Sequence, residues 1–214
     1  GVRITLIGRD IETPYSGMIP GFVAGNYSFD ECHIDLAQLA AWSGVRFVHA
    51  EAVGLDRANR RVILKDRPPI SYDVVSLDVG SAPSLDAIPG AAAHATPVKP
   101  IAELGRRWIA FLNRVKDRPG ALRIAVIGGG AGGVELALAI DHSLRTTARQ
   151  ASVSVTLATK GEILSGQSAA RHRIRAIFQE RKIRLLENAA TTRITRGAVH
   201  LESGQQIDVD EIFV

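Results

Sequence analysis

Residues 125–140 read AVIGGGAGGVELALAI, and three of their glycines, Gly128, Gly130 and Gly133, have the spacing G-x-G-x-x-G. The apolar run at 124–127 is typical of a buried strand, and the residues after the glycines are typical of a helix. This order predicts the first strand–turn–helix unit of a parallel sheet.

The second half of the chain continues the same alternation. Strand-like runs at 152–158 and 183–187 flank a helical pattern at 168–181. Together they predict an α/β fold of the Rossmann-like type, with doubly wound parallel sheets in three layers and right-handed crossovers. The segments 198–203 and 205–209 predict a small antiparallel hairpin, and a last strand follows at 211–214.

Each glycine of the motif has a separate physical role. Gly128 allows the tight turn that leaves the strand, Gly130 lets backbone N–H groups approach a pyrophosphate, and Gly133 lets the helix pack against the strand. The positive end of the helix dipole then faces the phosphates. The motif therefore predicts a dinucleotide site; the alternative is a glycine-rich turn that binds no ligand.

The end of the second strand falls near Thr159 and Lys160, where NAD-binding units usually carry an acid for the ribose hydroxyls. A cation at this position favours a 2′-phosphate and hence NADPH, whereas the alternative is a solvated loop lysine. Glu162 supplies the acid that binds the ribose hydroxyls only if the second strand ends later than expected. Glu135, two residues after Gly133, is interpreted as a polar group near the nicotinamide or as a plain acid at the helix start.

Composition limits the remaining possibilities. The 214 residues are 46% hydrophobic and 22% charged, with a net charge of +4, which predicts a packed globular protein that can hold anionic phosphates. Cys32 is the single cysteine, so the chain cannot form a disulfide or a paired-cysteine redox site of its own. We expect it to be a small buried residue at a helix start; a low-pKa thiolate is the alternative. The sequence contains no basic arm with interleaved aromatic residues, so we expect no nucleic-acid partner.

The first half predicts a less regular set of elements. We expect a strand at 2–8, a long irregular segment after it, and a short helix within 30–44 that Gly44 ends. Two strands should follow, then another strand within 70–83 and a helix at 100–117. Both ends of the chain have strand-like sequences, which predicts a piece of a longer polypeptide.

The mid-chain GGGAGGVELA motif, preceded by YDVVSLDVGSAP (72–83) and IPG (88–90), resembles the two-dinucleotide flavoproteins, the pyridine nucleotide-disulfide oxidoreductases. In that family an NAD(P)H-binding domain is inserted into an FAD-binding domain. The stretches TPYSGMIPGFVAGNYSFDECHIDL (13–36) and ATPVKPI (95–101) resemble the flavoprotein domain fused to selenide, water dikinase, which is similar to type II NADH dehydrogenases.

The resemblance implies a partial FAD-binding domain at 1–117 and an NAD(P)H-binding domain at 118–214. The first strand of the FAD domain and its glycine loop would precede residue 1, and a later FAD segment would follow Val214. The implied cofactors are FAD and NAD(P)H. The implied dinucleotide-binding residues are Gly128, Gly130, Gly133, Thr159, Lys160, Arg9, Pro14, Tyr15, Gly80 and Ser81.

The resemblance also assigns roles near the flavin. The loop that begins at Pro14 and Tyr15 would run near the isoalloxazine, and Gly80 and Ser81 would lie by the flavin dinucleotide. Lys99 and Glu135 are the implied catalytic residues, with Lys99 placing a positive charge near the flavin or remaining a linker lysine. In the family, the strand that corresponds to 2–8 ends in an acid that binds the FAD ribose. In this chain that position is Gly8, and Arg9 and Asp10 follow it.

The expected activity is hydride transfer from NAD(P)H to flavin and electron transfer to an unidentified acceptor. The alternative is a nucleotide-binding or redox-sensing module that serves a fused or partner enzyme. We expect a cytoplasmic protein without a transmembrane segment or nucleic-acid partner, with association with selenide, water dikinase and a homodimer as possible assemblies.

Overall fold

The computed structural model describes residues 1–80, 85–148 and 150–214, apart from the side chain of residue 102. The chain forms two compact units. Unit 1 comprises Gly1–Tyr15 and Phe29–Gly80, and unit 2 comprises Ser16–Ser28 and Ser81–Val214. The predicted cofactor-binding domains, 1–117 and 118–214, stay a prediction. Ser81 lies outside the described residues.

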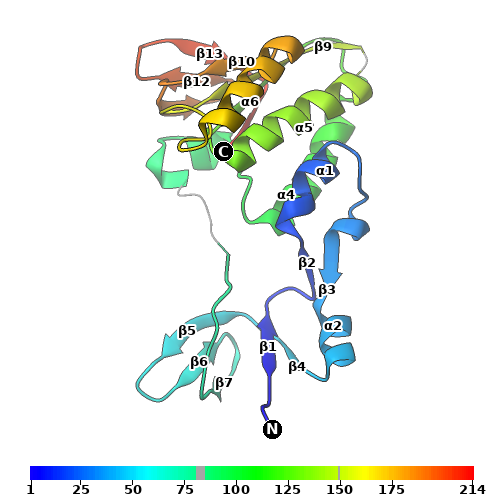
Figure 1. Cartoon of the computed structure of the whole chain (residues 1–214), viewed down its shortest axis with the longest axis vertical. Helices are drawn as coiled ribbons and strands as arrows, with labels where there is room; N and C mark the ends of the chain where they lie inside the picture. Colours follow the sequence, from blue (N-terminus) through cyan, green and yellow to red (C-terminus); the bar gives the residue numbers. More distant parts are fainter. Residues whose placement is uncertain (81–84, 149) are drawn as a thin grey trace. The chain divides into compact units, whose positions relative to one another are not determined.

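Unit 2 contains the predicted parallel sheet (Figure 1). Its strands, in spatial order, are β10 (Arg184–Leu186), β9 (Ala151–Ala158), β8 (Gly120–Ile127) and β14 (Glu211–Phe213). All neighbouring strands are parallel. The crossovers are the helices α5 (Ala131–Thr147) and α6 (Ser168–Arg181). The predicted α/β fold is therefore confirmed.

A three-stranded antiparallel sheet forms a further layer of unit 2. It comprises β11 (Thr191–Thr195), β12 (Ala198–Leu201) and β13 (Gln206–Asp208). The predicted hairpin is confirmed, but β11 is an additional strand. Ile194, Val199 and Ile207 of this sheet form one buried cluster with Ala125 and Ile212 of the parallel sheet. The two sheets therefore share a core.

Aromatic packing covers the other side of β14. The helix α4 (Ile101–Val115), which the sequence predicts, places Trp108 and Phe111 with their ring centroids each 6.0 Å from the Phe213 ring. Because Ile212 and Phe213 are adjacent in a strand, their side chains point to opposite faces. The strand β14 thus lies between the antiparallel sheet and α4, as the middle of three layers.

Short elements complete unit 2. They are η1 (Ser16–Met18), α1 (Ile19–Val23), η3 (Leu85–Ala87) and α3 (Ala91–His94). The helix α1 packs against α4 and α5 through buried Ile19, Phe22 and Val23 (Figure 1). The prediction that the segment after residue 8 is irregular is therefore wrong here. Ile19, Phe22 and Val23 have the i, i+3, i+4 spacing of a helix, but the proline and glycines around them obscure it in the sequence.

The backbone of 96–98 extends the parallel sheet beyond β14. The N–H of Thr96 donates to the carbonyl of Ile212 at 2.7 Å, and the N–H of Val98 donates to that of Val214 at 2.8 Å. The sequence gives no sign of this pairing, because ATPVK has no strand-like alternation. Lys99 follows this segment and lies two residues before Ile101, the first residue of α4.

Unit 1 is built from short strands and one regular helix. Its elements are β1 (Thr5–Gly8), β2 (Glu12–Pro14), η2 (Asp30–Cys32), β3 (His33–Asp35), α2 (Leu36–Ser43), β4 (Arg46–His49), β5 (Ala52–Asp56), β6 (Arg61–Leu64) and β7 (Arg67–Ser71). β1 pairs with β4 in parallel, β2 pairs with β3, and β5, β6 and β7 form an antiparallel sheet (Figure 1).

Two expectations for unit 1 are corrected. The helix within 30–44 begins only at Leu36, because Asp35 caps it by accepting the N–H of Gln38 at 2.9 Å; Gly44 ends it in the left-handed region, as predicted. The strand expected within 70–83 is wrong over the described residues: only Ile70 and Ser71 belong to a strand, as the end of β7, and 72–80 form none.

Cys32 also differs from the expected position. It lies in the 3₁₀ turn η2 rather than at an α-helix start, and it is buried, as expected. Burial and the neighbouring Glu31 raise the pKa of its thiol. The environment therefore disfavours a thiolate, which removes the low-pKa alternative.

An ion-pair network joins β14 to the rest of unit 2. Asp210 accepts hydrogen bonds from Arg118 Nη2 at 2.7 Å, from the backbone N–H of Arg123 at 2.8 Å, and from Arg123 Nε at 3.2 Å. Burial alone would raise the pKa of Asp210, but these hydrogen bonds outweigh it, and the pKa lies below its usual value. The charged carboxylate therefore stabilises the folded state.

We expect Asp210→Asn to lower the free energy of unfolding by about 1–3 kcal/mol at neutral pH, because Asn cannot form the charge-assisted bonds. A depressed carboxyl pKa contributes stability above its unfolded value, and that contribution is lost as the pH falls through the folded value. Urea unfolding across the acidic range should therefore show a smaller loss in the variant than in the wild type. Equal acid sensitivity would contradict this role of Asp210.

Candidate functional site

The glycine turn follows β8 at the carboxyl edge of the parallel sheet. Gly128 has φ +130°, a backbone conformation that side chains disfavour, and its N–H donates to the carbonyl of Ala158 at 2.9 Å. The turn leaving β8 is thus pinned to the end of β9. This is the backbone geometry for which Gly128 was predicted.

Two further glycines are needed because other atoms lie very close. A Cβ on Gly133 would lie 2.1 Å from the carbonyl oxygen of Gly128, so α5 approaches the turn more closely than any side chain allows. A Cβ on Gly129 would lie 2.4 Å from Thr159 Oγ1. Gly129 was missed by the sequence analysis because it lies outside the motif spacing; the run of three glycines was its signal.

Space is open around the start of α5. No described atom lies within 4 Å of a Cβ built on Gly130 or Gly132. Gly130 is the N-cap and supplies no side-chain hydrogen bond, and the first turn of α5 holds no acidic residue. The helix start therefore presents backbone N–H groups and a partial positive charge to an anion. A pyrophosphate group fits this cradle.

The loop after β9 forms the adjacent part of the site. Thr159 is 8% exposed; its N–H donates to the carbonyl of Leu186 and its carbonyl accepts the N–H of Ala189. Its side chain therefore packs on the glycine turn rather than standing open to a ligand. Lys160 is exposed and forms no ion pair with any residue that the structure describes.

Acidic residues near this edge are already engaged. Glu162 pairs with Arg171 and, at 3.0 Å, with Arg175. Glu187, which follows β10, accepts the N–H of Ile163 at 2.8 Å and pairs with Arg175 at 2.7 Å. Because β9 ends at Ala158, Glu162 does not hold the ribose position of a strand-end acid. Arg171 and Arg175, both on α6, thus anchor this loop.

Glu135 is the fifth residue of α5 and is exposed. It lies beyond the first turn, so the helix dipole does not account for an acid at this position. Its orientation toward a nicotinamide stays a prediction. Lys99 is exposed in unit 2, and its role beside a flavin likewise stays a prediction.

The remaining predicted residues lie in unit 1, apart from Ser81. Arg9 follows β1 and pairs with Asp10 at 3.1 Å, and its carbonyl is 2.9 Å from His49 Nε2. Pro14 ends β2, and the N–H of Tyr15 donates to the carbonyl of Cys32. Gly80 has φ +70°. Asp10 is thus already paired, two residues beyond the strand end at Gly8, where the family's ribose acid is expected.

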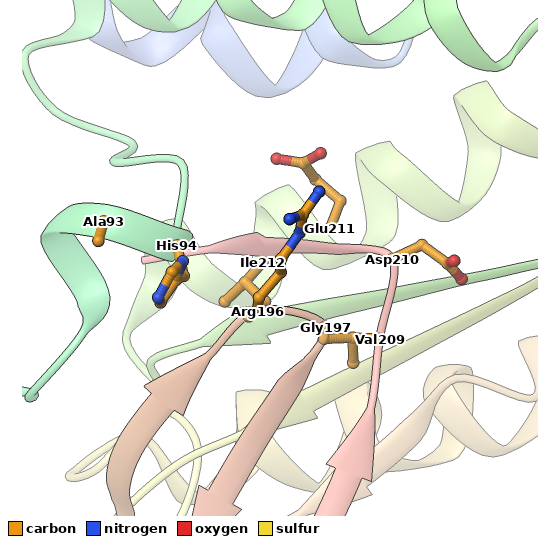
Figure 2. Close-up of a pocket in the computed structure, with 8 residues that line it drawn as sticks. All are labelled: Ala93, His94, Arg196, Gly197, Val209, Asp210, Glu211 and Ile212. Atoms are coloured by element: carbon orange, nitrogen blue, oxygen red, sulfur yellow. The ribbon is translucent and has the colours of Figure 1, made fainter.

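A pocket of about 400 Å³ lies elsewhere in unit 2, at the amino end of β14 (Figure 2). Its two carboxylates are engaged: Asp210 by Arg118 and Arg123, and Glu211 by Arg114 and Thr96 Oγ1. The glycine turn lies at the opposite, carboxyl edge of the sheet. In parallel α/β sheets ligands bind outside the carboxyl ends of the strands, so the glycine turn is the better candidate site.

The described residues contain no group of three or more His, Cys, Asp or Glu side chains that could hold a metal ion. None of the described helices is long and apolar enough to cross a membrane.

Comparison with known proteins decides the family. The profile of the pyridine nucleotide-disulphide oxidoreductases matches residues 1–214. The chain belongs to this family. The family resemblance of the mid-chain glycine motif is thereby confirmed.

Two curated proteins are similar in sequence to this chain. NADH dehydrogenase-like protein YutJ of Bacillus subtilis is 23% identical over 209 residues, covering 93% of this chain and 53% of YutJ. The alternative NAD(P)H-ubiquinone oxidoreductase C1 of Arabidopsis thaliana is 30% identical over 128 residues, covering 58% of this chain and 24% of that protein. The chain thus spans about half the length of the first relative.

Solved structures show the same fold. The sulfide:quinone oxidoreductase of Aquifex aeolicus superimposes with a TM-score of 0.80 at 21% identity, covering 99% of this chain and 52% of that one. NDH2 of Plasmodium falciparum in complex with NADH gives 0.81 at 16% identity, covering 99% and 49%. These similarities confirm the FAD/NAD(P)-binding type of α/β fold.

We expect Gly133→Ala to lower the free energy of unfolding by about 1–3 kcal/mol, because the added methyl would collide with the Gly128 carbonyl and neither backbone segment can move freely. Gly130→Ala is the control: its methyl meets no described atom, so the loss should stay below about 1 kcal/mol. Thermal and urea unfolding measure both. Equal losses would contradict the close approach of α5 to the turn.

Proposed function

We propose that this chain forms the pyridine-nucleotide-binding part of an FAD-dependent NAD(P)H oxidoreductase of the NADH dehydrogenase type. One observation carries the proposal: the glycine turn after β8 leaves an open, positively polarised cradle at the start of α5. Family membership and the two curated relatives, both named for oxidation of NADH or NAD(P)H, support it.

The residues of unit 2 bind and orient the nucleotide. Gly128 turns the backbone and Gly130 lets the pyrophosphate approach the N–H groups of α5, while Gly133 keeps the helix against the turn. Thr159 packs on Gly129, and the bond from the Gly128 N–H to the Ala158 carbonyl holds the glycine turn to β9. When bound, NAD(P)H supplies a hydride that FAD accepts and passes as electrons to a second acceptor.

The flavin-side assignments rest on the family resemblance. In the proposal, Lys99 supplies positive charge near the flavin and Glu135 a polar group near the nicotinamide. Arg9, Pro14, Tyr15, Gly80 and Ser81 contact the flavin dinucleotide. A homodimer, an association with selenide, water dikinase and a cytoplasmic location stay predictions.

We expect Gly130→Ala to weaken NAD(P)H binding by about tenfold or more, because its methyl would occupy the space of the pyrophosphate. Gly54→Ala in β5 is the matched control: there the methyl makes ordinary contact with Ile63 at 3.7 Å, and Gly54 belongs to the other unit. Titration followed by nicotinamide fluorescence measures both. Unchanged binding in Gly130→Ala would contradict the placement of the pyrophosphate.

Electron transfer is tested on the longer, FAD-loaded protein that the family resemblance implies, in the absence of oxygen. The proposal expects NADH or NADPH to bleach the visible band of oxidised flavin, and an artificial acceptor to restore it. Nucleotide binding without bleaching would contradict the proposed oxidoreductase activity and would favour the alternative, a nucleotide-binding module. Failure to bind either nucleotide would contradict both.

A further inference from the structure

We propose that the loop after β9 selects NADPH over NADH, with Lys160 as the residue that binds the 2′-phosphate. This inference rests on the proposed function, because it concerns the adenosine ribose of the same dinucleotide. In glycine-turn units of this type, the residues that follow the second strand contact that ribose. In this chain the second strand is β9, and Thr159 and Lys160 follow it.

The first argument is the lack of an available carboxylate at the strand end. NAD-binding units of this type use an acid at this position, which accepts hydrogen bonds from the ribose hydroxyls. Thr159 is buried and packs on Gly129, so it offers no replacement. NADH would therefore lose the interaction that normally favours it.

The second argument is that both nearby carboxylates have arginine partners. Glu162 pairs with Arg171 and Arg175, and Glu187 with Arg175 and the N–H of Ile163. These bonds link the loop after β9 to α6 and to the end of β10. The network fixes the loop and keeps its acids from the ribose.

The third argument is charge. Lys160, Arg171 and Arg175 place three cations around two carboxylates, and Lys160 is the cation that pairs with neither. An exposed lysine on a loop held by ion pairs is available to a dianionic phosphate without first breaking another contact. A charge-assisted hydrogen bond of this kind favours the phosphorylated nucleotide by about tenfold or more.

The test measures binding to the whole chain, independently of turnover. NADPH, NADH, adenosine 2′,5′-bisphosphate and 5′-AMP are titrated by calorimetry against the wild type and Lys160→Ala. We expect the wild type to bind each 2′-phosphorylated ligand about tenfold more tightly than its counterpart. Lys160→Ala should remove that difference and leave NADH binding unchanged.

Two further variants sharpen the comparison. Lys116→Ala removes an exposed lysine near the amino end of β8, the opposite edge of the sheet, and should leave the NADPH preference intact. Lys160→Glu supplies the missing acid and should reverse the preference toward NADH. Thermal unfolding of each variant verifies that the fold is retained.

Several results would overturn the proposal. Equal binding of NADH and NADPH by the wild type would disprove the selectivity while leaving the dinucleotide site intact. A parallel loss of both nucleotides in Lys160→Ala would assign Lys160 a general role instead. Binding of neither nucleotide would disprove the proposed function as well.

Discussion

The close approach of α5 to the turn after β8 is the constraint on which the site depends. With only 2.1 Å between the Gly128 carbonyl oxygen and a Cβ on Gly133, the helix start stands directly behind the turn. The N–H of Gly128 in turn binds the carbonyl of Ala158, so β9 and its loop are fixed to the same point. The carboxyl edge of the sheet, the start of α5 and the loop after β9 therefore meet at one place, and only glycine permits so close an approach.

The sequence predicted the parts of the fold whose signal is local. The helices α4, α5 and α6 are long segments with apolar residues at helical spacing. The strand β8 ends in an apolar run, and β9 alternates serine or threonine with apolar residues. It did not predict β11 or the pairing of 96–98 with β14, because these depend on partners far along the chain. The strand was predicted within 70–83 because that segment is rich in apolar residues. In the structure Val74 and Val79 are 89% and 85% exposed, so these residues do not pack into a sheet.

The candidate site divides in the same way. The spacing of the motif identifies Gly128, Gly130 and Gly133, because the role of each glycine follows from its position between a strand and a helix. The contact of Gly129 with Thr159, and the pairing of Arg171 and Arg175 with Glu162 and Glu187, join separate elements. Only the folded chain shows that Glu162 and Glu187 are already paired with arginines. The proposal for Lys160 depends on this pairing, because it leaves neither acid unpaired to bind the ribose.

The most direct test of the account is a crystal structure of this chain with bound NADPH. The account predicts the pyrophosphate within hydrogen-bonding distance of the backbone N–H groups at the start of α5, next to Gly130, with the 2′-phosphate beside Lys160. A nucleotide bound elsewhere, such as in the pocket at the amino end of β14, would contradict it.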